Sequence, residues 1–229
     1  GVNGDFDNYY STMSFEAEAQ IVRELGKFLL DGSLYQGFKP VYWSTVEKTA
    51  LADAEVEYHN HTSNTIFVAF KVKSSKKDYL KDVNIIIWTT TPWTIPANRA
   101  TTYNSSFDYS LVEINGLENF NEKKIVVATE LLDSVVKSCG IENFKVLKTF
   151  KGTEFEGTIC SHPLKNLGFN YDVPMFESRF VTLEQGTGIV HCAPSHGVDD
   201  YNLCLKHNIP SKYTVDNSGY YTKEIPFFE

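Results

Sequence analysis

The feature that most constrains this chain is an apolar run that stops abruptly at a row of hydroxyl groups. It reads Ile85-Ile86-Ile87-Trp88-Thr89-Thr90-Thr91-Pro92. Consecutive large apolar residues are typical of a strand buried on both faces. Pro92 removes a backbone donor and disfavours helical dihedrals at Thr91, so the chain should leave its sheet there. The three threonines therefore stand where a rigid strand becomes a loop. Their hydroxyls serve either ordinary strand-end solvation or the fixation of a polar ligand or water.

Short strand-like runs recur along the chain and are separated by turn residues. The patterns predict strands over residues 54–58, 65–72, 85–88, 109–114, 124–128 and 144–150, and a short strand that ends at His191. Helical spacing predicts helices over residues 14–31, 129–138 and 198–206. Many short strands with few helices predict a mostly β fold. We expect a closed β-barrel, because closure removes exposed sheet edges.

Charge and composition argue against several classes of protein. The chain has 229 residues and a formal net charge of -8, which disfavours a protein that coats nucleic acid by neutralising phosphates. The densest basic run comprises Lys71, Lys73, Lys76, Lys77 and Lys81. That run is either a solvated surface or a contact to RNA backbone. The four cysteines lack a C-x-x-C pair, and no apolar run reaches the length of a membrane span. We therefore expect a cytoplasmic protein without a membrane partner.

A second polar cluster lies in the C-terminal third. It runs from Gln185 to Tyr201 and includes the blocks Gly186-Thr187-Gly188-Ile189-Val190-His191 and His196-Gly197-Val198-Asp199-Asp200-Tyr201. The glycines permit close backbone approach before the short strand. Carboxylates in the first turn of a helix are favoured by the helix dipole. Asp199 and Asp200 therefore either cap the predicted helix or, where Asp200 turns inward, provide a fixed anion for an ammonium group.

Three kinds of chemistry are open to this cluster. A zinc site is disfavoured, because His191 and His196 on a strand and a turn do not have a standard ligand spacing. A nucleophilic triad is disfavoured, because the chain has no Gly-x-Ser-x-Gly elbow and Cys192 would face away from His191. The third alternative is a pocket in which threonine hydroxyls, a histidine and an aspartate position a substrate and a water.

The same blocks resemble the editing domain of isoleucyl-tRNA synthetases of the bacterial or organellar type. The matching segments are Trp88-Thr89-Thr90-Thr91-Pro92-Trp93-Thr94 with Asn98, both blocks of the second polar cluster, Phe38-Lys39-Pro40-Val41-Tyr42-Trp43-Ser44, and residues 49–58. In the sister valyl and leucyl domains, arginine usually replaces Thr91 and another residue replaces His191. Both positions favour the isoleucyl member. Ser195 is a departure, since this family often has glycine there.

The resemblance implies a β-barrel editing domain inserted into the nucleotide-binding fold of a synthetase. The ATP-binding signatures of such enzymes, His-Ile-Gly-His and Lys-Met-Ser-Lys-Ser, are absent from this sequence, so the chain is not expected to charge tRNA. We expect an N-terminal flank over residues 1–45, the editing domain over 46–215 and a return connection over 216–229. The implied partners are the acceptor end of isoleucine tRNA carrying valine and the rest of the synthetase chain, with the domain a monomer.

The resemblance also implies roles for individual residues. Asp200 would bind the α-ammonium group of the aminoacyl ester, and His191 would lie against the aminoacyl group or ribose and set the size limit. Trp93 would form a wall, whereas His196 is expected to be structural. The groups that would orient the ester and the attacking water are Thr89, Thr90, Thr91 and Asn98. Hydrolysis of valyl-tRNA, with valyl-adenylate as a further substrate, would then use positioned water and no metal, cofactor or covalent intermediate.

Three alternatives remain open at this stage. The chain could bind the aminoacylated acceptor end with little turnover, because its basic surface is sparse. It could instead be the editing domain of a valyl or leucyl sister enzyme. It could also be a β-barrel protein unrelated to tRNA.

Overall fold

The structure is a computed structural model that describes residues 1, 3–115, 120 and 122–228. Its chain divides into two units, Gly1–Phe38 and Lys39–Glu229. The predicted division at residues 45 and 215 remains a prediction, and residue 229 of the predicted return connection lies outside the described residues. Among the described residues, no helix combines the length and the apolar character needed to cross a membrane.

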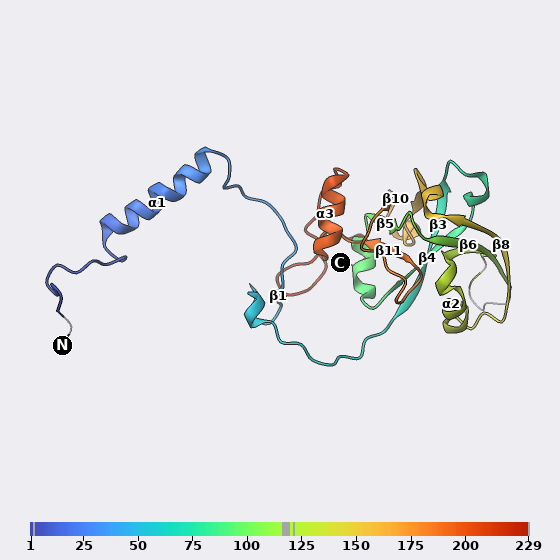
Figure 1. Cartoon of the computed structure of the whole chain (residues 1–229), viewed down its shortest axis with the longest axis horizontal. Helices are drawn as coiled ribbons and strands as arrows, with labels where there is room; N and C mark the ends of the chain where they lie inside the picture. Colours follow the sequence, from blue (N-terminus) through green and yellow to red (C-terminus); the bar gives the residue numbers. More distant parts are fainter. Residues whose placement is uncertain (2, 116–119, 121, 229) are drawn as a thin grey trace. The chain divides into compact units, whose positions relative to one another are not determined.

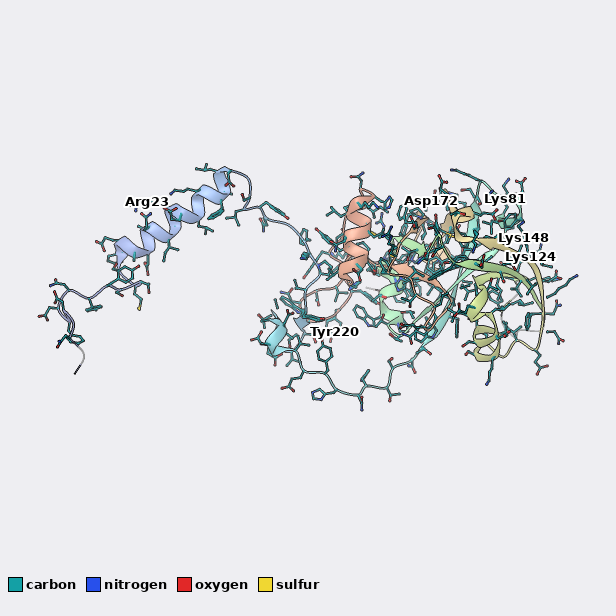
Figure 2. The ribbon with its side chains drawn as sticks, in the orientation of Figure 1. Arg23, Lys81, Lys124, Lys148, Asp172 and Tyr220 are labelled. Carbon is teal, nitrogen blue, oxygen red and sulfur yellow. The ribbon has the colours of Figure 1, made fainter. Side chains whose placement is uncertain are left out.

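The first unit carries one helix, α1 (Phe15–Leu30), where the sequence predicted a helix. The helix begins there because the Ser14 hydroxyl accepts a hydrogen bond from the Ala17 N–H at 3.3 Å. It ends before Gly32, whose φ of +83° is favourable only for glycine. Side chains project all around α1, with Arg23 labelled in Figure 2. Its apolar stripe is more than half exposed among the described residues and comprises Ile21, Val22, Leu25, Phe28 and Leu29.

The second unit contains the strands and the other helices of the described residues (Figure 1). Two short strands form a hairpin, β1 (Trp43–Ser44) and β2 (Thr49–Ala50). One nine-stranded sheet contains β3 (Ile66–Ser74), β4 (Asn84–Thr89), β5 (Ala100–Tyr103), β6 (Asp108–Asn115), β7 (Lys124–Ala128), β8 (Asn143–Lys151), β9 (Ile159–Ser161), β10 (Asp172–Glu177) and β11 (Ile189–Cys192). The α-helices are α2 (Leu132–Ser138) and α3 (Val198–Lys206). The 3-10 helices are η1 (Asp53–Glu55), η2 (Asp78–Leu80), η3 (Pro92–Ala97), η4 (Thr129–Leu131), η5 (Gly152–Phe155) and η6 (Lys165–Leu167).

The fold is mostly β, as predicted, but the prediction of a closed barrel is wrong. The strand order is β11-β5-β10-β9-β3-β4-β7-β6-β8, and the pairs β4–β7 and β5–β10 are parallel. The end strands β11 and β8 share no ladder among the described residues, so the sheet is open and mixed. Its edges are protected without closure. Strand β11 has only 4 residues, and β8 carries Lys145, Lys148 and Lys151, with Lys148 labelled in Figure 2. Short edges and lysines both discourage the addition of another strand.

The core lies around β4, the strand that the sequence predicted to be buried on both faces. Ile85 and Ile87 are fully buried, and Ile86 on the opposite face is 6% exposed. Phe70 of β3 and Tyr109 of β6 join the same cluster, and the buried face of α2 packs against it. Because β4 is held by β3 on one side and β7 on the other, its C-terminal end is fixed in space.

Several other predicted elements are present, and some are not. The strands expected over residues 65–72, 109–114 and 124–128 are β3, β6 and β7, and the helix expected over 198–206 is α3. The helix expected over 129–138 begins as η4 before it continues as α2. The strand expected over 54–58 is wrong, because the Glu55 carboxylate accepts a hydrogen bond from the Ala52 N–H at 2.7 Å and closes the turn η1. Strand β8 forms, but Phe150 is its only buried residue.

The basic run is an ion-paired surface. Its five pairs are Lys71–Glu122 at 3.4 Å, Lys73–Asp172 at 2.5 Å, Lys76–Glu156 at 2.9 Å, Lys77–Glu154 at 3.4 Å and Lys81–Asp78 at 2.6 Å. Lys81 and Asp172 are labelled in Figure 2. Pairing with carboxylates lowers the net positive charge that the run can offer to phosphates. The arrangement therefore favours the interpretation as a solvated surface.

Candidate active site

The two polar segments singled out in the sequence meet at one cavity. Strands β4 and β11 lie side by side without sharing a ladder, and α3 follows β11 directly (Figure 1). The cavity has a volume of about 400 Å³. It is lined by Trp88, Thr89, Thr90, Thr91, Thr94, Phe180, Thr182, Gln185, Gly186, Thr187, Gly188, Ile189, Val190, His191, Ala193, His196, Gly197 and Asp200. Five of the predicted site residues, Thr89, Thr90, Thr91, His191 and Asp200, are therefore brought together.

The three threonines form one wall of the cavity. The Thr89 side chain is buried, and its hydroxyl accepts a hydrogen bond from the Thr91 N–H at 3.1 Å. The same Oγ1 lies 3.3 Å from the Thr91 Oγ1. The chain turns here because Pro92 begins η3 and cannot donate to the sheet. Thr90 and Thr91 remain exposed, so their hydroxyls are available to a ligand.

His191 forms a second wall from β11 and is buried, with 7% of its surface exposed. Its Nε2 lies 3.1 Å from the Thr94 Oγ1. Its Nδ1 is buried and has no hydrogen-bond partner among the described residues. Burial lowers the pKa of His191 to about 4, and the charges of His162 and His196 add to that effect. The imidazole is therefore neutral near pH 7.

Asp200 turns inward from the first turn of α3. Its Oδ2 accepts a hydrogen bond from the Ala193 N–H at 2.9 Å. Burial raises the pKa of Asp200 to about 6; the Ala193 N–H opposes this shift, and Asp199 adds to it. Asp199 is exposed and does not line the cavity. The pocket thus holds a carboxylate that is mainly ionised at pH 7 and has no lysine or arginine partner among the described residues.

Trp93 and His196 form a pair at the edge of the cavity. Their rings meet edge to face with centroids 4.8 Å apart, and the His196 Nε2 lies 3.0 Å from the Thr214 Oγ1. Burial lowers the pKa of His196 to about 4. His196 lines the cavity, whereas Trp93 does not and is 51% exposed. Trp93 therefore stands behind His196 rather than against the cavity.

Asn98 is fully buried and lies outside the cavity lining. Its amide Nδ2 donates to the Ala100 carbonyl at 2.7 Å and to the Cys192 carbonyl at 3.4 Å. These bonds connect the end of η3 to β5 and β11. Asn98 is thus placed to hold the two walls together, and among the described residues its amide forms no hydrogen bond to the other predicted site residues.

The Gly186-Thr187-Gly188 loop presses closely on the sheet. The Thr187 carbonyl accepts from the Ala128 N–H at 2.8 Å, and Gly188 has a φ of +70°. A β carbon at Gly188 would lie 2.3 Å from the β carbon of Ala128. The glycine is therefore required both by its dihedral and by the approach to β7.

Sequence reasoning missed several lining residues. Thr94 belongs to a block that carries the family resemblance but is not among the predicted site residues, yet its hydroxyl lies within hydrogen-bond distance of His191. Its spacing three residues after Thr91 would have been informative, because η3 is a 3-10 helix and places those two residues in contact. Phe180 and Thr182 also line the cavity. They lie in an irregular segment without periodicity, and only their closeness to the Gly-Thr-Gly block pointed to them.

The arrangement of potential metal ligands is sparse. Among the residues that the structure describes, no group of three or more His, Cys, Asp or Glu side chains is placed to hold a metal ion. The Nε2 atoms of His191 and His196 each lie within hydrogen-bond distance of a threonine hydroxyl. The polar groups of the pocket are thus arranged to hold a ligand by hydrogen bonds and by one carboxylate.

Comparison with known proteins identifies the family. The profile described as "tRNA synthetases class I (I, L, M and V)" matches residues 1–206. The chain belongs to this class I tRNA synthetase family. Two similar proteins, each called isoleucine--tRNA ligase, come from Pelagibacter ubique and Gluconobacter oxydans. They are 64% and 46% identical, and the matches cover 100% and 99% of this chain. The resemblance to isoleucyl-tRNA synthetases is therefore confirmed.

The matches also define what part of these synthetases the chain resembles. It spans about a quarter of their length, 25% of the Pelagibacter protein and 24% of the Gluconobacter protein. Among solved structures, the editing domain of the cytosolic leucyl-tRNA synthetase of Plasmodium knowlesi is similar with a TM-score of 0.50 and 16% identity. That match covers 63% of this chain and 62% of the other. The likeness concerns the fold, which is that of a synthetase editing domain.

Proposed function

We propose that this domain removes valine from wrongly charged isoleucine tRNA by hydrolysing the aminoacyl ester. The observation that supports this most is the single cavity in which Thr89, Thr91, His191 and Asp200 converge from segments far apart in the sequence. Family membership points the same way. The partners under this proposal are the acceptor end of the tRNA and the rest of a synthetase chain.

The residues divide the work according to their chemistry. The Asp200 carboxylate binds the α-ammonium group of the ester, since it is ionised at neutral pH and has no lysine or arginine partner in the part of the chain that the structure describes. The hydroxyls of Thr89, Thr90 and Thr91 hold the ester and the attacking water, because a hydroxyl both donates and accepts. Holding reactants in a fixed geometry is itself a large source of rate enhancement. The same pocket would accept valyl-adenylate, which carries the same aminoacyl group.

Size exclusion explains why such a second pocket is useful. A binding site cannot strongly reject a substrate that lacks one methylene, because the binding energy of one methylene is only ~1–3 kcal/mol. Synthetases of this family are the standard example of this limit. A narrower pocket excludes the larger amino acid by overlap. His191 is the wall suited to this task, since it is buried and neutral.

The experiment compares two neighbouring carboxylates. Deacylation of valyl-tRNA and isoleucyl-tRNA is measured for the chain, for Asp200→Ala and for Asp199→Ala. We expect hydrolysis of valyl-tRNA only, a loss of about 100-fold in kcat/KM for Asp200→Ala from the lost charge-assisted bond, and parent activity for Asp199→Ala. Equal activity of Asp200→Ala and the parent would contradict the role of Asp200 in binding the ammonium group. Hydrolysis of isoleucyl-tRNA at the same rate would remove the assigned specificity.

A second candidate function is binding of the aminoacylated acceptor end without appreciable turnover. The ion pairs of the lysine run favour it, because they leave little free positive charge to hold a tRNA during catalysis. Titration with a non-hydrolysable valyl-adenosine analogue separates the two functions. Saturable binding without hydrolysis of valyl-tRNA supports the binding module, and binding together with hydrolysis supports the enzyme.

A further inference from the structure

We propose that Thr94 is a positioning residue that fixes His191 in the tautomer with its proton on Nε2 and leaves Nδ1 as an acceptor. The consequence for turnover rests on the proposed function. The tautomer itself does not, since it concerns two side chains of this chain.

The inference follows from counting the protons of one hydroxyl group. The Thr94 Oγ1 lies 2.9 Å from the carbonyl oxygen of Thr91, which can only accept, so the hydroxyl donates there. A threonine hydroxyl has a single proton and retains acceptor capacity on its oxygen. The His191 Nε2 lies 3.1 Å from that oxygen. Nε2 must therefore carry a proton and donate it to Thr94.

The local fold keeps this hydroxyl in place. Thr94 lies in the first turn of η3, and its backbone N–H also donates to the Thr91 carbonyl at 3.0 Å. The carbonyl thus accepts twice from one residue, which its two lone pairs allow. Thr94 is buried. Both the orientation of its hydroxyl and the acceptor that it presents to His191 are determined by the backbone of η3.

The state of the other ring nitrogen follows. His191 is neutral near pH 7, because burial lowers the pKa of its imidazole to about 4. A neutral imidazole has one N–H. With that proton on Nε2, Nδ1 carries a bare lone pair, and it is buried without a partner among the described residues. The hydrogen bond that one ring nitrogen makes thus decides what the other can do.

This assignment limits the role of His191 in the pocket. The ring cannot donate a proton from Nδ1, and its Nε2 is occupied by Thr94. The chemical group that suits Nδ1 is therefore an O–H or N–H donor. Fixed at Nε2, the ring also presents a constant surface to the aminoacyl side chain, as size exclusion requires.

The first measurement is the tautomer. The full chain is labelled with ¹⁵N-histidine, and the His191 signals are assigned by comparison with His191→Gln. Nitrogen shifts distinguish a protonated ring nitrogen from a bare one. We expect one Nε2-protonated state between pH 6 and 8 in the parent and in Thr94→Ser, which keeps the hydroxyl. In Thr94→Val the Nε2 proton faces a methyl group, and we expect the Nδ1-protonated form to become populated.

The second measurement is turnover. We expect Thr94→Val to lower kcat/KM for valyl-tRNA about tenfold, the effect of one hydrogen bond, while Thr94→Ser restores most of it. The matched control is Thr102→Val on β5, which also removes a buried threonine hydroxyl but lies outside the cavity lining. Where Thr94→Val melts well below the parent, Thr94→Ala takes its place, because it removes the hydroxyl without filling the space.

Two results overturn the proposal. One is a parent chain in which His191 is protonated on Nδ1. The other is a variant without the Thr94 hydroxyl that retains the single Nε2-protonated state, whether or not its turnover falls. A parent that does not hydrolyse valyl-tRNA contradicts the proposed function alone, and the spectra then decide the tautomer by themselves.

Discussion

Gly197 and Asp200 approach so closely that a β carbon on Gly197 would lie 2.9 Å from the Asp200 Cγ. Gly197 has an extended backbone with φ of -128°, which any residue can adopt. A glycine at this position thus leaves room for the Asp200 carboxylate and is not required by the backbone conformation. The Asp200 Oδ2 can then reach the Ala193 N–H at 2.9 Å.

Substituting this glycine should therefore damage the pocket more than the fold. We expect Gly197→Ala to displace the carboxylate and to lower kcat/KM for valyl-tRNA at least about tenfold, with a destabilisation of ~1–3 kcal/mol from overpacking. Deacylation assays and thermal melting measure the two effects. Gly26→Ala is the control, because its new β carbon would have nothing within 4 Å. Parent activity in Gly197→Ala would contradict the assigned position of Asp200.

The raised pKa of Asp200, about 6, predicts how activity depends on pH. Under the proposed function an ionised Asp200 carboxylate binds the ammonium group, so KM for valyl-tRNA should rise as the pH falls through about 6. His191 and His196 have pKa values lowered to about 4 and stay neutral over the same range. A pH profile of kcat/KM from pH 4.5 to 8 should thus show one acidic limb near 6. An acidic limb that persists in Asp200→Asn would show that another group titrates there.

The lowered pKa of the buried His162 predicts that the stability of the fold depends on pH. It is 1% exposed, and burial lowers its pKa to about 4 from 6.5. The folded state disfavours the charged imidazole. The stability that the neutral His162 contributes is therefore fully present above pH 6.5 and is lost as the pH falls toward 4. The loss is about 3 kcal/mol at about 1.4 kcal/mol per pKa unit. Denaturant unfolding at pH 7 and pH 4.5 should show a smaller difference for His162→Gln than for the parent. An equal difference would mean that His162 does not titrate on unfolding.

Gly188 and Gly140 form a natural pair for testing the close packing of the Gly-Thr-Gly loop. Both have positive φ, +70° and +66°. A β carbon at Gly140 meets nothing within 4 Å, whereas one at Gly188 lies 2.3 Å from the Ala128 β carbon. We expect Gly140→Ala to cost about 1–2 kcal/mol of stability from the dihedral alone. Gly188→Ala should cost clearly more and should also impair deacylation. Equal melting temperatures for the two variants would show that the loop moves away from β7 without penalty.

Local patterns in the sequence predicted the central elements well. The run Ile85 to Trp88 has no polar position, and the structure places it in β4, an interior strand of the sheet. The Ser14 cap and the spacing of the first helix were read correctly, because both depend only on neighbours in the chain. The acidic first turn of α3 was equally clear. Such features are determined by local hydrogen bonds and periodicity.

Features that depend on distant partners were not predicted. Closure of the sheet was expected from a general argument about edges, but short strands and lysines protect the edges of this sheet instead. Strand β5 was missed because Ala100 to Tyr103 contains two threonines and no apolar alternation; pairing with β10 and β11 determines it. The prediction that Asn98 and Trp93 belong to the pocket rests on the family block alone. Whether a side chain enters the cavity depends on the path of η3, which no periodicity reveals.

The pocket's two walls stand on β4 and β11, which touch without a shared ladder. During translation a domain generally folds as a unit. A growing polypeptide that has delivered the threonines but not yet Asp200 holds half of a binding surface. Under the proposed function, deacylating ability should consequently arise in a single step once α3 has left the ribosome, and translation products truncated before α3 should be inert toward charged tRNA.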